Sequence, residues 1–187
     1  MMRILYHACC GVCSLYPVKV MREENIDFAL YYANPNIHPY KEWKERKKTF
    51  VAMAESRHVT YYIEKEYPLE EFLKTQLHYD NRCEYCYQSR LTLAADLALR
   101  EGYDAFSTTL TISPYQNLEL IRRIGERIAN EKGIAFYFRD FREGFQWVQE
   151  TAEVEGLYRQ KYCGCIFSER DRYMKRKKKK VTGGESS

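Results

Sequence analysis

Cysteines are the residues of this 187-residue chain whose types and spacing can do the most chemistry. There are seven, and in order along the chain they are Cys9, Cys10, Cys13, Cys83, Cys86, Cys163 and Cys165. An odd number of cysteines, in a chain whose first residues lack the long apolar stretch of a signal peptide, argues against a disulfide framework. We therefore expect metal binding or thiol redox chemistry, and a cytoplasmic location.

The first group lies in the segment His7-Ala8-Cys9-Cys10-Gly11-Val12-Cys13-Ser14. This segment joins a short apolar strand to a helix, but it contains neither the GxGxxG pattern nor the lysine of a phosphate-binding loop. Because a helix N-terminus favours negative charge, thiolates are stabilised there, and the thiolate is the form that binds metal or attacks. The alternative is a cluster of small buried thiols.

The second group, Cys83-Glu84-Tyr85-Cys86, is a CxxC pattern that we place immediately before a helix. Zinc sites usually combine CxxC pairs about 12 to 20 residues apart, whereas the first two groups are much farther apart. Four thiolates from two loops can instead hold a cubane iron–sulfur cluster, although the spacing of bacterial ferredoxins is absent. The spacing thus favours a cluster over zinc, and buried structural thiols remain a third alternative.

The third group is the CxC pattern of Cys163 and Cys165. Such a pattern can chelate a metal or form a strained disulfide, and both alternatives stay open beside ordinary buried thiols. The four histidines show no HExxH pattern, so a zinc protease of that type is not supported. Asp80, Asp140 and Glu143 are carboxylates near turns or strand ends, which can donate a proton, bind iron or simply face solvent.

Composition indicates a globular protein, with 45% hydrophobic and 30% charged residues. No apolar run approaches the roughly 18 residues needed to cross a bilayer, so we expect no membrane association. The net charge of +4 comes from six basic residues at 175–180, without which the remainder carries −2. That run is either a solvated end or an arm that binds a polyanion such as RNA. A second basic stretch, at 40–47, mixes aromatic and basic side chains as nucleic-acid surfaces and amphipathic helices both do.

Hydrophobic periodicity predicts strands and helices in alternation. We expect strands at 3–7, 28–33, 59–64, 105–112 and 134–138, and helices at about 15–24, 40–56, 88–101 and 118–131, with a short helix opened by Pro68. Alternation of this kind predicts an α/β fold with a mostly parallel sheet and helices on both faces, whose ligands gather at the carboxyl ends of the strands. The first cysteine group lies at such an end. We expect one domain over residues 1–170 with a C-terminal elaboration, followed by a basic, disordered tail at 171–187.

Several segments together make the chain resemble the cobalamin-independent epoxyqueuosine reductases. The matching segments are His7 to Ser14, Asn34-Pro35-Asn36-Ile37, Arg82 to Cys86 with Arg90-Leu91, Thr108 to Tyr115, Asp140-Phe141-Arg142 and Tyr158 to Cys165. The resemblance covers residues 3 to 168. It implies a Rossmann-like fold of the adenine nucleotide alpha hydrolase type.

The resemblance also implies an activity, which is the reductive removal of the epoxide oxygen from epoxyqueuosine at the wobble position of tRNA. It further implies a 4Fe-4S cluster with a second iron ion beside it, and a separate electron donor of the ferredoxin or flavodoxin type. On this basis we expect Cys9, Cys10, Cys83 and Cys86 to bind the cluster. Cys13, Cys163 and Cys165 are then expected to bind the second metal, or to form a redox pair in the case of the last two.

Substrate contacts and proton donors follow from the same resemblance. Asp80, Asp140 or Tyr115 is expected to supply a proton, and the segment from Thr108 to Tyr115 to hold the nucleoside. For tRNA binding we expect the basic residues Lys44, Arg46, Lys47, Lys48, Arg122 and Arg123. Two other classes remain possible for such a sequence: a zinc-bound RNA-binding module, and a cluster-dependent tRNA thiolation enzyme, although the SGGxDS-like ATP loop of the latter is missing.

Overall fold

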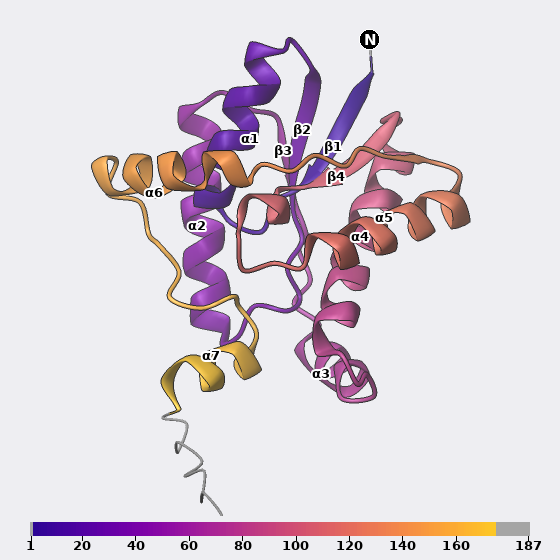
Figure 1. Cartoon of the computed structure of the whole chain (residues 1–187), viewed down its shortest axis with the longest axis vertical. Helices are drawn as coiled ribbons and strands as arrows, with labels where there is room; N and C mark the ends of the chain where they lie inside the picture. The colour runs from indigo at the N-terminus through magenta and orange to yellow at the C-terminus, as the bar shows by residue number, and fades with distance from the viewer. Residues whose placement is uncertain (1, 175–187) are drawn as a thin grey trace, which may run out of the picture.

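Five parallel strands form a single sheet at the centre of the molecule (Figure 1), in a computed structural model that describes residues 2–174. Their order across the sheet is β3-β2-β1-β4-β5, so the first strand lies in the middle. The strands are β1 (Arg3–His7), β2 (Asp27–Tyr32), β3 (Tyr61–Ile63), β4 (Ala105–Thr108) and β5 (Ala135–Phe136). All four pairings are parallel, which confirms the predicted α/β fold class.

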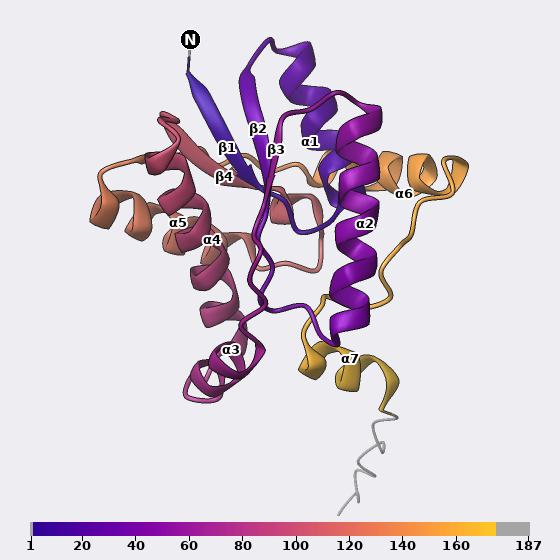
Figure 2. The ribbon, with the colours of Figure 1, turned by 180° about the vertical axis from the view of Figure 1, so that it is seen from behind.

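Helices cover both faces of this sheet, as predicted. Figures 1 and 2 show α1 and α2 on one side, and α4 and α5 on the other. The α-helices are α1 (Gly11–Glu23), α2 (Tyr40–Ser56), α3 (Leu69–Gln76), α4 (Arg82–Arg100), α5 (Leu118–Lys132), α6 (Phe145–Val154) and α7 (Ile166–Tyr173), and the short 3-10 helices are η1 (Thr109–Ile112) and η2 (Arg142–Gly144).

Alternating side chains of the central strand divide the core into two halves. Ile4 and Tyr6 of β1 pack with the cluster formed by α1, α2 and α6, whereas Leu5 packs with the cluster of α4 and α5. This alternation follows from the two-residue period of a strand. Because β1 is buried on both faces, it fixes the loop that follows it, which carries the first cysteines.

Three element boundaries differ from the sequence prediction and change where the chemistry lies. Helix α1 begins at Gly11 rather than near residue 15, because the Cys10 side chain caps it. Helix α4 begins at Arg82 rather than 88, because Asn81 caps it, so Cys83 and Cys86 lie inside the helix and not before it. The predicted strand 105–112 ends at Thr108, and residues 109–112 form a 3-10 turn.

The C-terminal part of the chain turns back toward the carboxyl edge of the sheet. Helix α7 extends to Tyr173, so residues 171–173 of the expected tail are helical, and the basic run at 175–180 lies outside the described residues. Within residues 2–174 no helix combines the length and the apolarity needed to span a bilayer.

Candidate metal centre and active site

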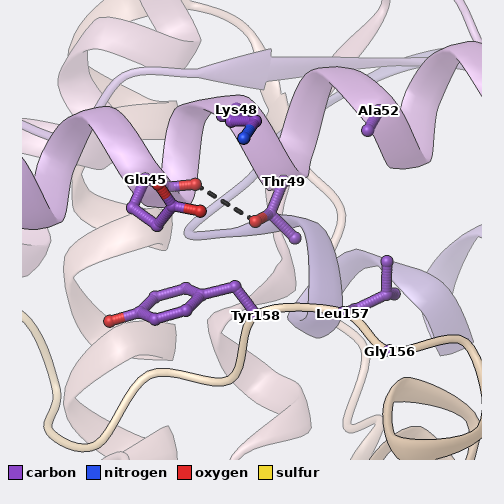
Figure 3. A pocket seen from close by; sticks show the side chains of 7 residues that line it. All are labelled: Glu45, Lys48, Thr49, Ala52, Gly156, Leu157 and Tyr158. Atoms are coloured by element: carbon purple, nitrogen blue, oxygen red, sulfur yellow. Dashed lines mark hydrogen bonds between the residues drawn. The ribbon is translucent and has the colours of Figure 1, made fainter.

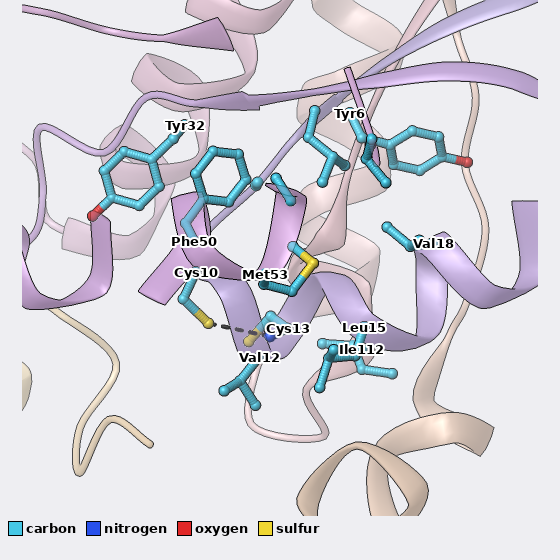
Figure 4. Packing of buried hydrophobic residues seen from close by; sticks show 14 of the residues in the cluster. Tyr6, Cys10, Val12, Cys13, Leu15, Val18, Tyr32, Phe50, Met53 and Ile112 are labelled. Carbon is cyan, nitrogen blue, oxygen red and sulfur yellow. Dashed lines mark hydrogen bonds between the residues drawn. The ribbon is translucent and has the colours of Figure 1, made fainter. Parts of the chain in front are cut away.

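The first cysteine group forms a compact set of sulfur atoms at the end of β1. The Sγ atoms of Cys9, Cys10 and Cys13 all lie within 4.8 Å of one another. The Cys13 backbone N–H donates a hydrogen bond to Cys10 Sγ at 3.2 Å, which is how Cys10 caps α1 (Figure 4). Thr109 approaches from the end of β4, where its hydroxyl accepts from the Cys9 N–H at 3.3 Å.

These contacts favour a thiolate at Cys10. Hydrogen bonds from the thiols of Cys13 and Cys9 are the main causes that hold the pKa of Cys10 well below its usual range, and the Arg46 charge acts in the same direction. The same coupling raises the pKa of Cys9 to about 11 and also raises the pKa of Cys13. The hydrogen bonds of its two neighbours thus lower the pKa of the one thiol that caps the N-terminus of α1.

The second group lies in the first two turns of α4. Cys83 is exposed, whereas Cys86 is buried, and burial raises the pKa of the Cys86 thiol to about 12. Burial also raises the pKa of the Cys83 thiol, and ionisation of Cys163 and Cys165 adds to the rise at both Cys83 and Cys86, so the third group lies close enough to interact electrostatically with the second.

The third group is held in place by a segment that follows β2. The Arg46 guanidinium donates to the carbonyl of Cys163 at 2.9 Å and to that of Tyr162 at 3.0 Å. The His38 backbone N–H donates to the carbonyl of Gly164 at 2.7 Å. His38 Nδ1 also accepts from the backbone N–H of Ile166 at 3.3 Å. Four hydrogen bonds thus fix a cysteine turn more than a hundred residues away in sequence.

Two glutamines and one arginine join the three groups into one site. Gln160 Nε2 lies 3.5 Å from Cys13 Sγ, and Gln116 Nε2 lies 3.4 Å from Cys163 Sγ. The buried Arg90 interacts electrostatically with Cys86, Cys163 and Cys9. The cysteines that the sequence predicts to meet at the carboxyl edge of the sheet therefore do so. Cys13, which the sequence analysis groups with Cys163 and Cys165, has its sulfur within 4.8 Å of the sulfurs of Cys9 and Cys10.

The donor set of the first group fits a metal ion. In a tetrahedral thiolate site with metal–sulfur bonds of about 2.3 Å, neighbouring sulfurs are about 3.8 Å apart. Three sulfurs within 4.8 Å of one another need only small side-chain adjustments to reach that geometry. Among residues 2–174 no other group of three or more His, Cys, Asp or Glu side chains brings its ligand atoms this close together. Cys9, Cys10 and Cys13 can therefore bind a metal ion.

The expected proton donors differ in their surroundings. Asp140 accepts several hydrogen bonds from Arg142, and this pairing lowers the pKa of the Asp140 carboxyl, which makes it a poor proton donor at neutral pH. Asp80 is exposed immediately before the residue that caps α4. Tyr115 is 86% exposed and adjoins Gln116, so it lies at the rim of the site.

The expected tRNA-binding residues also differ in how exposed they are. Arg46 is only 2% exposed and is fully engaged with Glu42 and the cysteine turn, so the surface role expected for it is wrong. Lys44, Lys48, Arg122 and Arg123 are exposed, and Lys47 lies partly buried over the ring of Trp43. Arg123 and Arg127 line a hollow of about 260 Å³ with Glu84, which adjoins Cys83.

A larger hollow of about 390 Å³ lies between α2 and the segment 156–158 (Figure 3). Its lining contains Lys48 and Tyr158 but no cysteine, and Tyr158 donates to the Glu42 carboxylate at 2.5 Å. The segment that leads from α6 to the third cysteine group is therefore anchored on α2 before it reaches the site.

Several residues that the sequence analysis did not assign support the cysteines. They are Asn34, His38, Arg90, Gln116 and Gln160. Most of them belong to the segments that carry the family resemblance, or lie next to one, and this resemblance was the signal that could have pointed to them. The spacing of residues in the sequence does not by itself predict a role for them.

Comparison with known proteins identifies the family of this chain. The chain matches the family described as "Epoxyqueuosine reductase QueH" over residues 4–171. It is 33% identical over 174 residues to the "Epoxyqueuosine reductase QueH" of Dehalococcoides mccartyi, covering 92% of this chain and 96% of that protein. Proteins of the same name from Staphylococcus epidermidis (34% identity, 89% and 76% coverage) and Thermotoga maritima (33% identity, 88% and 89% coverage) are also similar. The chain therefore belongs to the QueH family of epoxyqueuosine reductases.

Proposed function

We propose that this protein reduces epoxyqueuosine to queuosine at the wobble position of tRNA. The observation that carries the proposal is that all seven cysteines of a QueH family chain lie on segments that meet at the carboxyl edge of its parallel sheet. This edge is where open α/β folds bind their ligands. A tRNA substrate is consistent with a cytoplasmic enzyme.

The reaction needs two electrons and two protons. Both C–O bonds of the epoxide break, the oxygen leaves as water, and the two ring carbons form the double bond of a cyclopentene. The electrons must come from an external donor, for which we propose a protein of the ferredoxin or flavodoxin type.

The donor set supports thiolate-bound iron, which we propose as a 4Fe-4S cluster with a second iron ion next to it. When bound, such a centre supplies the electrons one at a time and a Lewis acid for the epoxide oxygen. Cys9, Cys10, Cys83 and Cys86 form the cluster in the division expected from the sequence, with Cys13, Cys163 and Cys165 at the second iron. The sulfur positions favour a different division, in which Cys13 shares its metal with Cys9 and Cys10.

The remaining side chains position these sulfurs and the substrate. Gln116 and Gln160 each direct an amide N–H at a sulfur, which orients Cys163 and Cys13 toward the site. Because Arg142 lowers the pKa of the Asp140 carboxyl, Asp80 and Tyr115 remain as the proposed proton donors. The exposed Tyr115 at the rim contacts the nucleoside or its neighbours in the anticodon loop.

Mass spectrometry of the modified nucleoside tests the reaction. Anaerobically purified protein is incubated with tRNA that contains epoxyqueuosine and with dithionite, and we expect the nucleoside to lose the mass of one oxygen atom. A chain with Cys9, Cys10 and Cys13 all replaced by Ala is the control and should leave the mass unchanged. No loss of oxygen by protein whose metal centre is reduced would refute the proposed function.

Metal analysis separates this proposal from its alternatives. We expect a brown protein with about four or more irons per chain and inorganic sulfide. A colourless protein that contains only zinc would instead support an RNA-binding module. A thiolation enzyme would add sulfur to tRNA, which the same mass measurement detects.

Replacement of single cysteines decides between the two ligand divisions. If Cys13 shares its metal with Cys9, then Cys13→Ala and Cys9→Ala remove the same absorption and EPR signals. If the division expected from the sequence holds, Cys13→Ala resembles Cys163→Ala, which spares most of the colour but stops turnover, while Cys83→Ala bleaches the cluster. The spectra of the four variants, normalised to iron content, give the answer.

A further inference from the structure

A buried arginine lies between the cysteine groups without an acidic partner. Arg90, on α4, is 1% exposed and is among the largest fully buried side chains. Its Nε donates to the Cys86 carbonyl at 2.9 Å, and its Nη2 donates to Cys86 Sγ at 3.1 Å. Within residues 2–174 it forms no ion pair with a carboxylate. A guanidinium loses several kcal/mol of hydration on burial, so its charge must be balanced by some other group.

Arg46 provides a direct comparison within the same molecule. It is equally buried, at 2% exposure, but its Nε pairs with the Glu42 carboxylate at 2.7 Å and its two terminal nitrogens donate to carbonyls. A complete set of partners of this kind is the usual state of a buried arginine. Arg90 has a sulfur atom in the place of the carboxylate.

The groups next to Arg90 that can carry a negative charge are cysteine sulfurs. Cys86 Sγ accepts its hydrogen bond at 3.1 Å, and Cys163 and Cys9, from the other two groups, also act on its charge once they are ionised. Its guanidinium also lies 5.7 Å from the ring of Tyr87, whose hydroxyl donates to Gln116 at 2.7 Å, and Gln116 in turn reaches Cys163. Cysteines lose their protons when they bind metal, so this negative charge is largest when metal is bound.

We propose that Arg90 is the internal counter-cation of the metal–thiolate centre. Its positive charge compensates the thiolates of the three groups together, and it stabilises the reduced centre, which carries one more negative charge, more than the oxidised one. The inference rests on the proposed function only in taking the metal to be iron. Arg90 is a positioning and electrostatic residue here, because it acts through the sulfur ligands and not on the substrate.

The first test compares Arg90→Met in metal-free and metal-loaded protein. Replacing a lone buried charge by an apolar side chain of similar length is often neutral or stabilising. We therefore expect the urea midpoint of the metal-free variant to equal or exceed that of the metal-free wild type under reducing conditions. In the metal-loaded protein we expect the urea midpoint of the variant to be lower than that of the wild type. We also expect the variant to lose its metal to a chelator about 10-fold faster or more.

Arg46→Met is the matched control. It leaves the Glu42 carboxylate buried without its partner, so its urea midpoint should fall in both the metal-free and the loaded protein. If Arg90→Met also lowers both midpoints, Arg90 has an ordinary structural role and the proposal is wrong. Because zinc thiolates carry the same type of charge, this test works equally well if the protein binds zinc and the proposed reductase activity fails.

The second test measures the reduction potential of the iron-loaded centre by dithionite titration with EPR detection. Loss of the positive charge should make reduction at least 10-fold less favourable, a shift of about 59 mV to more negative potential for a one-electron couple. Arg90→Lys keeps the charge and should restore most of this shift. An unchanged potential in Arg90→Met would overturn the proposal, even if the wild-type protein deoxygenates tRNA as proposed.

Discussion

Gly164 lies between the two cysteines of the third group and has a backbone φ of 147°. A Cβ atom at this position would lie 3.2 Å from Ile37 and 3.3 Å from Arg46 and Asn36. Gly164→Ala should therefore strain the turn and lower the free energy of unfolding by about 1–3 kcal/mol. Since the turn also positions Cys163 and Cys165, we expect the variant to bind less metal per chain, as measured by metal analysis after reconstitution.

Gly102→Ala is the control for backbone strain alone. Gly102 also has a positive φ, of 70°, but a Cβ there would have no neighbour within 4 Å. Its replacement should cost about 1–2 kcal/mol and leave the metal content unchanged. Equal metal contents in the two variants would show that the geometry of the Gly164 turn does not control metal binding.

The sequence draws attention to the cysteines, but it does not reveal most of the residues that hold them in place. Cysteines are rare and reactive, so their grouping and their position after a strand are informative. Arg46 and His38 hold Cys163 and Cys165 through backbone carbonyls and N–H groups, and no side-chain pattern reveals such bonds. A lysine-rich and arginine-rich helix therefore suggested a surface role for Arg46, whereas tertiary packing buries it.

At the scale of elements, the close approach of α1 and α2 sets the position of the first cysteine group. A Cβ atom on Gly11 would lie 2.7 Å from the carbonyl oxygen of Thr49, which belongs to the backbone of α2. Gly11→Ala should push the two helices apart at a cost of about 1–3 kcal/mol in unfolding free energy. Because Cys10 and Cys13 lie at this end of α1, we also expect a weaker affinity for metal, measured by competition with a chelator.

A second overpacked glycine serves as the control for that experiment. A Cβ on Gly125 in α5 would lie 2.2 Å from the ring of Phe136, which is in β5 and outside the cysteine site. Gly125→Ala should lower the unfolding free energy by a similar amount without changing the metal affinity. If Gly11→Ala lowers the unfolding free energy but leaves the metal affinity unchanged, the position of α1 does not determine the positions of the cysteine sulfurs.

Element boundaries were predictable where periodicity and end signals agree. The predicted helix over 40–56 coincides with α2, because charged residues alternate with the buried positions Trp43, Phe50 and Met53 throughout its length. The stretch 105–112 was expected to be one strand, but it is apolar or small throughout and buried, so periodicity cannot show where β4 ends and η1 begins. The start of α4 was missed because its first turns contain Cys83 and Cys86, which were interpreted as a loop.

At the scale of the whole molecule, the parallel sheet brings distant segments to one edge. Five segments contribute to the site, over a span from Cys9 to Cys165. They are the residues that follow β1, β2 and β4, the start of α4 and the segment after α6. The fold class predicts this convergence, since carboxyl ends of parallel strands share an edge. It cannot predict the path of the C-terminal segment, which depends on contacts with α2 such as that between Tyr158 and Glu42.

An exposed arginine on α5 tests where the tRNA proposed as substrate binds. Arg123 on α5 is exposed, forms no ion pair within residues 2–174, and lines a hollow with Glu84, the neighbour of Cys83. We expect Arg123→Ala to weaken tRNA binding and to reduce the slope of log affinity against log salt concentration by about 1, the contribution of one phosphate contact. Arg100→Ala is the control, because Arg100 is also exposed but lies at the far end of α4, about 28 Å from its start. Filter-binding or fluorescence titrations at several salt concentrations measure both slopes. Equal slopes for the two variants would show that Arg123 contacts no phosphate and that the tRNA does not bind at the α5 face.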